Sequence, residues 1–572
     1  MRNLISLILF SAIVLLLSSC HDLNLSPLSS GSTESWYSSA DEIRLAVNKA
    51  YQSDFLLMDG QYDENNSDWS DDTMYRQTLL AFQNATLDAQ NSLTRRRWIN
   101  NFKLISKMNA VINKYQRAIS NGASENEIMP YVGEAYFFRA RAYGELLYHF
   151  GDVPYYTDDI DITTAKNMSR TDKNEVAQHM NEDFDKAASL LPTSYSGDQR
   201  ATRGAALAFK ARYNLYLGNF AIAADAAKQV MDMGIYKLEA NYAQLFLPTT
   251  TSSPEFIFIM PRSISAKLNV LDAGYVRNYI PRNQGGWACY DPTWDLLAAY
   301  TCSDGLPIDK SPLFNPHDPF KNRDPRCSMS IVAFGSEYMD YIYDPSPKAK
   351  EVKQVSTGKM VYNNDTRVNK FYASFNGLVW RKYADESWIS TNGYQSENPK
   401  IMMRYADVLL MYAESKIELN QIDQSVLDAM NSVRARAYGV DKSEVDKYPA
   451  FSIKPQKEMR YDLRIERRME LAGEHLRYAD IIRWKIAPDV FSKKCMMLVD
   501  PSNLNALYEA GNWFWGKTPK IDENGIADFS ELEAAGMCMP ASERKWDDRQ
   551  YLWPIPSAEI EINPNMKQNP GY

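Results

Sequence analysis

Several stretches of this sequence alternate alanine with large apolar residues at helical spacing, and they constrain the fold more than any other feature. The stretch EAYFFRARAYGELLYHF is followed by Gly151 and Pro154, a combination that stops a helix. Another stretch breaks at Gly218 and restarts directly afterwards, as two paired helices would. Helices are predicted at residues 98–115, 134–150, 201–217, 220–234, 401–419 and 424–438.

Small residues on these predicted helices, such as Ala208, Ala211, Ala223 and Ala227, allow neighbouring helices to approach closely. The helix pairs resemble tetratricopeptide repeats, although the spacing between pairs is not constant. Repeat arrays bury apolar surface between neighbours. This arrangement suits a chain of 572 residues without a Gly/Ser-rich or Pro-rich linker, because single cores stop growing at about 250–300 residues. The sequence therefore predicts a mainly α fold with a scaffold of helical pairs.

The remaining sequence is irregular and rich in Asn, Asp, Gly and Pro, chiefly at residues 236–399 and 488–551. Short strands are predicted at residues 255–260 and 328–334. Long loops inside a compact domain are usually functional or disordered. Their high aromatic content favours function.

The N-terminal segment predicts secretion and a lipid anchor. Arg2 is followed by fourteen mostly apolar residues, LISLILFSAIVLLL. This run is shorter than the roughly 20 residues of a membrane span and fits a signal peptide. The small residues before Cys20 are similar to a bacterial lipobox. We expect residues 1–19 to be removed, Cys20 to be acylated, and residues 20–572 to form one domain; the alternative is an ordinary signal peptide.

Charge and cysteine usage exclude several classes of protein. The 63 basic and 72 acidic residues give a net charge of −9, and no basic stripe appears, which argues against nucleic-acid binding. The cysteines after Cys20 are odd in number and irregularly spaced, unlike a disulfide framework or a zinc site. The five histidines show no metal-ligand spacing either. We therefore expect no catalytic or zinc-type metal site and no cofactor, and whether a calcium ion braces an acidic loop is left open.

Six motifs, in order along the chain, resemble the SusD/RagB family. The longest is LRIERRMELAGEHLRYADIIRW, and the chain closes with LWPIPSAEIEINPNMKQNPGY. The motifs lie at residues 20–27, 151–156, 323–326, 404–415, 463–484 and 552–572.

This resemblance implies a lipoprotein on the outer membrane of a glycan-foraging Gram-negative bacterium, facing the cell exterior. Such a protein binds oligosaccharide or polysaccharide and delivers it to a SusC-type TonB-dependent transporter for nutrient uptake. It implies no catalytic residues, and a SusD-like helical scaffold with loop-rich ligand-binding insertions around residues 55–80, 236–399 and 488–551.

Exposed aromatic side chains are the natural candidates for a sugar site, because an indole or phenol pairs an apolar body with a polar tip. Trp69 lies in a polar loop, NNSDWSDD, and Trp287 follows two glycines, which permit close backbone approach. Both are the main predicted platforms, against the alternative that Trp69 anchors the core. The lesser candidates are Tyr75, Tyr290 and Trp294, with Asp68, Arg76 and Asn283 predicted to contact sugar hydroxyl groups.

Other tryptophans are interpreted differently. Asp291 and Pro292 predict the start of a helix, which favours core packing for Trp294 over ligand contact. Trp388 remains a minor ligand candidate. Trp98 and Trp484 are expected in the core, and Trp513 and Trp515 are left open between core and surface.

Two patterns imitate catalytic motifs. GNWFWGKT at residues 511–518 matches a phosphate-binding loop by letters, but Pro519 follows it where the helix must begin. Glu470 and Glu474 lie side by side on a predicted helix, as glycosidase carboxylates do in space. Neighbouring charged residues indicate an ion-pair ladder instead. The remaining alternatives are a surface glycoside hydrolase, a peptide-binding member of the same family and an interaction scaffold.

Overall fold

The computed structural model describes residues 36–56, 69–197 and 199–572. The predicted signal segment, Cys20 and Asp68 lie outside these residues. Scaffold helices are α2 (Ala40–Asn48), α4 (Ser92–Lys114), α6 (Glu125–Phe150), α8 (Lys173–Leu190), α9 (Arg203–Leu217), α10 (Phe220–Asp232), α15 (Tyr405–Glu418), α16 (Gln424–Ala437) and α17 (Gln456–Glu470).

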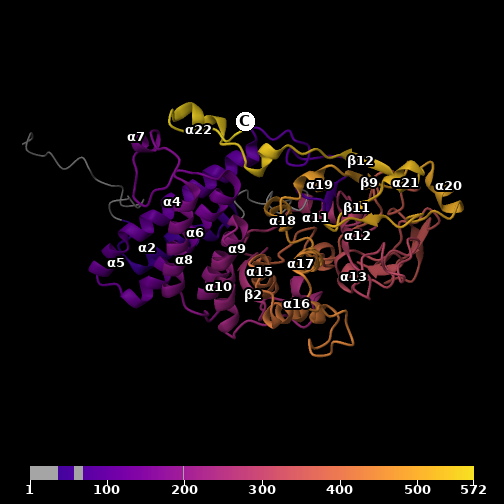
Figure 1. The fold of residues 1–572 in the computed structure, drawn as a ribbon, viewed down its shortest axis with the longest axis horizontal. Coiled ribbons are helices and arrows are strands. Elements are labelled where there is room, and N and C mark those ends of the chain that lie inside the picture. Colours follow the sequence, from indigo (N-terminus) through magenta and orange to yellow (C-terminus); the bar gives the residue numbers. More distant parts are fainter. Residues whose placement is uncertain (1–35, 57–68, 198) are drawn as a thin grey trace, which may run out of the picture.

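The scaffold helices pack as a continuous series of neighbours, and Figure 1 shows α2 to α10 on one side of the molecule and α15, α16 and α17 near its middle. In this series α6 packs against α4 and α8, α9 against α8 and α10, and α15 against α10, α16 and α17. Close approach of α9, α10 and α15 is possible because Ala208, Ala211, Ala223 and Ala227 are buried at their contacts. The prediction of a mainly α fold built on helical pairs is confirmed.

The other half consists of short elements joined by long loops (Figure 1). Its core centres on fully buried aromatic side chains, among them Trp294 and Trp515. The short helical segments of the described residues are η1 (Lys49–Tyr51), α3 (Ser53–Leu56), α5 (Gln116–Ser120), α7 (Ile162–Ala165), η3 (Gln244–Phe246), α11 (Ala273–Tyr279), α12 (Trp294–Ala299), α13 (Arg326–Ser330), α14 (Ser387–Ser390), α18 (Arg477–Arg483), α19 (Ala487–Phe491), α20 (Leu504–Glu509), α21 (Ser530–Ala534), η4 (Asp548–Tyr551) and α22 (Ser557–Ile562).

Strands in the described residues form antiparallel pairs and no larger sheet. The pairs are β1 (Thr73–Tyr75) with β3 (Tyr290–Pro292), β2 (Phe256–Met260) with β8 (Lys400–Arg404), β4 (Ser336–Tyr338) with β5 (Tyr341–Tyr343), β6 (Glu351–Lys353) with β7 (Met360–Tyr362), β9 (Lys494–Met497) with β12 (Met539–Glu543), and β10 (Lys520–Ile521) with β11 (Ala527–Asp528).

Three local predictions were wrong because tertiary contacts override local pattern. The helix predicted from residue 401 begins at Tyr405, since residues 400–404 pair with β2 as strand β8. Residues 326–330 form helix α13 where a strand was predicted from residue 328. Asp291 lies in strand β3, and Thr293 is the true N-cap of α12, accepting the Leu296 N–H at 3.1 Å.

Helix α17 carries buried charges on several faces at once. Its Glu466 pairs with Arg326 at 2.7 Å and with Arg434 at 2.8 Å. Arg467 pairs with Asp407 of α15 at 2.9 Å. These side chains are all at most 6% exposed. Buried charges of this kind persist only when they are paired and hydrogen-bonded.

Glu470 and Glu474 belong to this buried network. Glu470 contacts Arg326 at 2.9 Å, Arg404 at 2.6 Å and also Arg436, while Glu474 contacts Arg404 at 2.7 Å. Burial alone raises the pKa of Glu470, but the three guanidinium groups overcome this effect and hold the pKa well below its usual range. A carboxylate so strongly paired is a poor proton donor, which supports the ion-pair interpretation over a catalytic one.

The cysteines from Cys289 to Cys538 are free and buried. Residues 511–518 run from α20 into an irregular segment, and no helix follows Thr518 directly. Across the described part of the chain, no three His, Cys, Asp or Glu side chains gather as a metal site. Within the same residues, every helix falls short of the length and apolar character that a membrane crossing requires.

We predict that Glu470→Gln destabilises the protein strongly, because it removes the carboxylate that Arg326, Arg404 and Arg436 share and leaves these buried arginines with fewer compensating charges. Loss of one partner of a buried ion pair costs about 3–5 kcal/mol. The free energy of unfolding, measured by urea denaturation, tests this. The matched control is Lys457→Gln on the exposed side of the same helix, where the pair with Glu523 is solvent-exposed and worth at most about 1 kcal/mol. Equal losses in both variants would contradict the prediction.

Candidate ligand-binding surface

Strands β1 and β3 bring together two of the predicted site residues. The register aligns Tyr75 with Tyr290 and Met74 with Asp291. Directly opposed residues share a face of the ladder, and the rings of Tyr75 and Tyr290 have centroids 4.7 Å apart. The structure therefore places in one cluster two tyrosines that are far apart in the sequence.

Two further tyrosines extend this cluster. Tyr279 of α11 stacks on Tyr290 with centroids 5.3 Å apart and planes at 19°, and Tyr275 lies 4.8 Å from Tyr279. Sequence reasoning missed both, although their spacing of four residues places them on one helix face. We call Tyr75, Tyr290, Tyr279 and Tyr275 the tyrosine row.

Trp287 lies beside this row on a tightly held loop. Its backbone N–H donates to the Arg277 carbonyl at 2.6 Å, and the Gly286 N–H donates to the Pro281 carbonyl at 2.9 Å. The side chain is 40% exposed. The predicted exposure of Trp287 is thus confirmed, and its contact with ligand remains a prediction.

Two arginines connect the Trp287 loop to a second pair of exposed rings. The Arg76 and Arg282 guanidinium groups donate to the Trp287 carbonyl at 3.5 and 3.3 Å. Arg282 also donates to the Tyr372 carbonyl, and Arg76 lies over the Tyr372 ring at 5.3 Å. Tyr372 is 55% exposed and Phe371 is 54% exposed. We call the tyrosine row together with Trp287, Phe371 and Tyr372 the aromatic platform.

Asn283 braces the platform loop from inside. Its side-chain oxygen accepts hydrogen bonds from the backbone and side-chain N–H groups of Asn364, both at 2.9 Å. The backbone N–H groups of Arg282 and Asn283 donate to the Asp365 carboxylate at 2.6 and 3.3 Å. We expected Asn283 to contact sugar hydroxyl groups, whereas these hydrogen bonds are made within the protein.

Trp69 is not part of the platform. It is 4% exposed, and its indole stacks on Phe82 at 4.6 Å and meets Tyr478 and Trp553 at 5.6 and 5.5 Å. The prediction of a solvent-facing Trp69 was wrong, because distant segments supply the apolar partners that its own loop lacks.

Trp294 is also a core residue. It is fully buried, its indole N–H donates to the Asn376 carbonyl at 2.9 Å, and its ring meets Phe514 and Trp515 at 5.1 and 5.6 Å. Ligand contact by Trp294 is therefore excluded in this conformation, in agreement with the core interpretation. Trp515 is buried with it, which removes a surface role for that residue.

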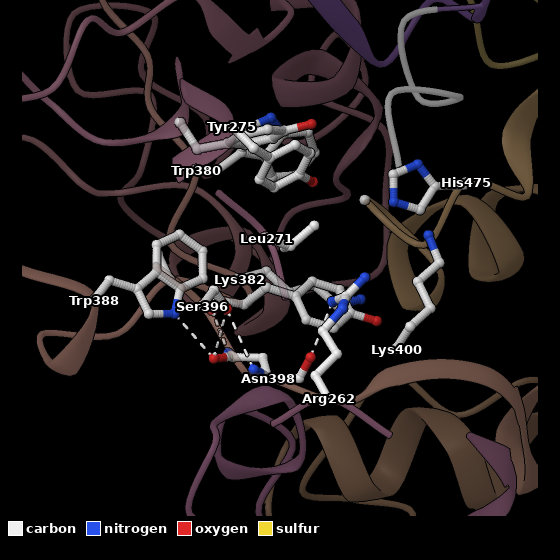
Figure 2. A pocket seen from close by; sticks show the side chains of 14 residues that line it. Arg262, Leu271, Tyr275, Trp380, Lys382, Trp388, Ser396, Asn398, Lys400 and His475 are labelled. Carbon is white, nitrogen blue, oxygen red and sulfur yellow. Dashed lines mark hydrogen bonds between the residues drawn. The ribbon is translucent and has the colours of Figure 1, made fainter. Parts of the chain in front are cut away.

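A cavity adjoins the platform and shares Tyr275 and Tyr279 with it. Figure 2 shows Tyr275 and Trp380 on one side of this cavity, with Asn398 opposite them. The Asn398 side-chain oxygen accepts from the Trp388 indole N–H at 2.9 Å. The buried Trp380 N–H, by contrast, has no hydrogen-bond partner among the described residues. Sequence reasoning missed Trp380, which no local signal distinguishes from a core residue.

Two buried aspartates near the platform, Asp291 and Asp365, have raised pKa values. Burial raises the pKa of Asp291 to about 8, against the opposing effects of Ser374, Arg76 and Arg282. Burial likewise raises the pKa of Asp365 to about 6. The platform therefore rests on buried carboxyl groups, while its exposed edge offers guanidinium donors and aromatic faces. This arrangement suits binding of a neutral, hydroxyl-rich ligand.

Gly286 is predicted to be essential for the platform loop. A Cβ at residue 286 would lie 2.0 Å from the Ile280 carbonyl oxygen, so Gly286→Ala must displace the loop that carries Trp287. Overpacking of this kind costs about 1–3 kcal/mol, measurable as a lower free energy of unfolding. Gly274→Ala on α11 is the control, because its Cβ meets only the Asp272 side chain, at 3.3 Å. A neutral Gly286→Ala variant would contradict the model of the loop.

Asp291→Asn is predicted to change the pH dependence of stability. An aspartate in an unfolded chain titrates near pH 3.9, whereas Asp291 in the folded protein has a pKa of about 8. Folded protein therefore holds a proton that unfolded protein has lost, and this contribution to stability falls as pH rises from about 4 to 8. Thermal unfolding of Asp291→Asn from pH 5 to 9 should show a smaller decline. The exposed control Asp158→Asn should follow the parent protein; a parallel decline in all three would refute the assignment.

Two protein-family models and several known proteins match this chain. The family model described as "SusD family" matches residues 254–572, and one described as "Starch-binding associating with outer membrane" matches residues 33–217. SusD-like protein P2 of Formosa agariphila is 25% identical over 589 aligned residues, covering 99% of each chain.

Solved structures of SusD-like proteins have folds similar to that of this chain. A SusD-like carbohydrate-binding protein from Bacteroides fragilis has a TM-score of 0.75 and 28% identity, covering 93% of this chain and 99% of its own. A laminarin-binding SusD-like protein has a TM-score of 0.64 at 18% identity, covering 94% and 100% of the two chains. These descriptions are of binding proteins and not of enzymes, as we expected for this chain. Since the first family model spans more than half of the sequence, the chain belongs to the SusD family.

Proposed function

We propose that this protein captures oligosaccharide or polysaccharide on the aromatic platform. The observation that carries the proposal is the exposed Trp287 indole, held by a braced loop beside the tyrosine row. Aromatic faces pack on the apolar C–H surfaces of sugar rings. Arg76 and Arg282 border the same surface and supply N–H donors for sugar hydroxyl groups. The description of the Bacteroides fragilis relative as carbohydrate-binding supports this ligand class.

We further propose that the protein is held at the outer membrane by acylated Cys20, faces the cell exterior, and passes its ligand to a SusC-type TonB-dependent transporter. Support comes from the lipobox-like N-terminal sequence and from the family description "associating with outer membrane". More than one acyl chain is needed for stable anchoring, which acylation of a lipoprotein cysteine would provide. Metabolic labelling with a palmitate analogue, lost in Cys20→Ser, tests this step.

A glycoside hydrolase is the less favoured alternative. Glycosidases need two carboxyl groups about 5–9.5 Å apart on either side of the sugar. The conspicuous pair, Glu470 and Glu474, is fully engaged with buried arginines. Near the platform, Asp291 and Asp365 are buried beneath the surface. Binding without bond cleavage fits these residues better.

The proposal is tested by titrating the protein, beginning at residue 21, against a panel of polysaccharides by isothermal calorimetry. We expect saturable binding of one glycan class and no release of reducing sugar. Trp287→Ala should weaken this binding at least about tenfold, which is about 1.4 kcal/mol, without lowering the melting temperature, because the indole is partly solvated.

Tyr508→Ala is the matched control, since Tyr508 is 37% exposed on α20 and is not part of the platform. Affinity retained in Trp287→Ala would reject the platform as the site. Release of reducing sugar from a panel member would reject the binding function in favour of hydrolysis.

A further inference from the structure

A second cavity lies apart from the platform and shares no lining residue with it. It has a volume of about 650 Å³, within the range of about 300–1,000 Å³ typical of small-ligand sites. Its walls come from the C-terminal ends of α6, α9 and α18 and from the chain around Tyr551. We call this cavity the basic groove.

Cations outnumber acids in this groove, although the whole chain has a net charge of −9. The lining cations are Arg170, Lys173, Arg464, Arg483 and Lys485, and the lining acids are Asp152, Glu414 and Glu418.

The groove acids are already engaged within the protein. Glu414 pairs with Arg483 and accepts the Trp484 indole N–H at 2.6 Å. Glu418 pairs with Arg460, outside the groove, at 2.6 Å. Asp152 accepts the backbone N–H of Lys173 at 2.9 Å. Among the described residues, the remaining groove cations therefore make no ion pair within 4 Å.

Arg464 is the central unmatched cation. Its guanidinium lies 4.9 Å from the centroid of the Trp484 ring, and its Nε is buried without a hydrogen-bond partner among the described residues. Among the described residues, the Arg464 side chain also makes no ion pair within 4 Å. An arginine stacked on an indole keeps its N–H edge available for a planar anion such as a carboxylate.

Two lysines and one hydroxyl group add to this site. Lys485 lies over the Tyr551 ring at 3.7 Å, and burial together with the Lys173 charge lowers its pKa. The buried Tyr148 hydroxyl lacks a hydrogen-bond partner among the described residues. Part of the positive charge compensates helix C-termini, as when Arg170 donates to the Phe150 carbonyl at 3.2 Å. Arg464, Lys173 and Lys485 make no such bond.

We infer that the basic groove is a second carbohydrate subsite, which binds an anionic sugar residue bearing a carboxylate or a sulfate ester. Arg464 and Lys485 bind the anion, and the Tyr148 hydroxyl contacts a sugar hydroxyl group. A groove volume of about 650 Å³ fits a short saccharide better than an extended acidic peptide. The inference rests on the proposed function for the ligand class only, because the groove and the platform are separate surfaces.

The test compares methyl glucuronide with methyl glucoside, two sugars that differ in one carboxylate, by calorimetric titration of the protein beginning at residue 21. We expect the glucuronide to bind at least tenfold more tightly. Glucose 6-sulfate forms a second arm, and tighter binding of either anionic sugar identifies which anion the groove prefers. Equal affinity for glucuronide and glucoside, with no gain for the sulfate ester, would overturn the inference.

Variants locate the site. Arg464→Gln and Lys485→Gln should each weaken binding of the preferred anionic sugar at least fivefold, with unchanged circular dichroism. Lys107→Gln removes an exposed lysine of α4 outside the groove and should leave affinity unchanged. Trp287→Ala is titrated in parallel: affinity lost in Trp287→Ala but kept in Arg464→Gln would place the anionic sugar on the platform and refute the groove, so that failure of the platform and failure of the groove are distinguishable. Loss in Lys107→Gln equal to that in Arg464→Gln would indicate non-specific charge attraction and refute the site.

Two competitors complete the design. Inorganic sulfate and a hexaglutamate peptide are titrated against protein saturated with the preferred sugar. We expect each to compete at least tenfold more weakly than the anionic sugar itself. Stronger competition by sulfate would reduce the groove to a simple anion site, and stronger competition by the peptide would assign it to an acidic protein partner; either result overturns the inference.

Discussion

The buried ion pairs of helix α17 are the interaction on which the two halves of this molecule depend. Glu466 and Glu470 face arginines that include Arg326 of the loop-rich half and Arg434 of the scaffold. Arg467 faces α15 and Arg468 faces Asp71 at 2.8 Å. A buried pair is often no more stabilising than apolar packing, but breaking it is costly. The helix thus fixes the relative position of its neighbours more than it adds to stability.

The same pairs position the aromatic platform. Arg468 and Arg477 hold Asp71, which lies two residues before the first residue of β1, Thr73. Because β1 pairs with β3, the position of Asp71 sets where Tyr75 meets Tyr290. A displacement of Asp71 would therefore move the Tyr75 ring, although Asp71 does not contact that ring. The aromatic platform is therefore coupled to the core through one short strand.

Sequence reasoning recovered features that depend on local pattern and failed where distant partners decide. Helices α9, α10 and α16 followed from apolar spacing and glycine breaks. Trp69 and Trp287 both lie in polar loops, yet only Trp287 is exposed. The difference lies in Tyr478 and Trp553, which cover Trp69 from more than 400 residues away and leave no trace beside it. Trp380 was missed for the same reason, because its surroundings come from distant segments. The glycines before Trp287, by contrast, were a local signal of an exposed loop.

A platform assembled from three chain segments has a consequence for binding. Residues 73–75, 275–290 and 371–372 are held by strand pairing, by backbone hydrogen bonds to α11 and by Arg282. Rings fixed in this way lose little conformational freedom when a ligand arrives, so less binding energy is lost to ordering them. On the proposed function, this arrangement suits a protein that captures a glycan repeatedly and passes it on.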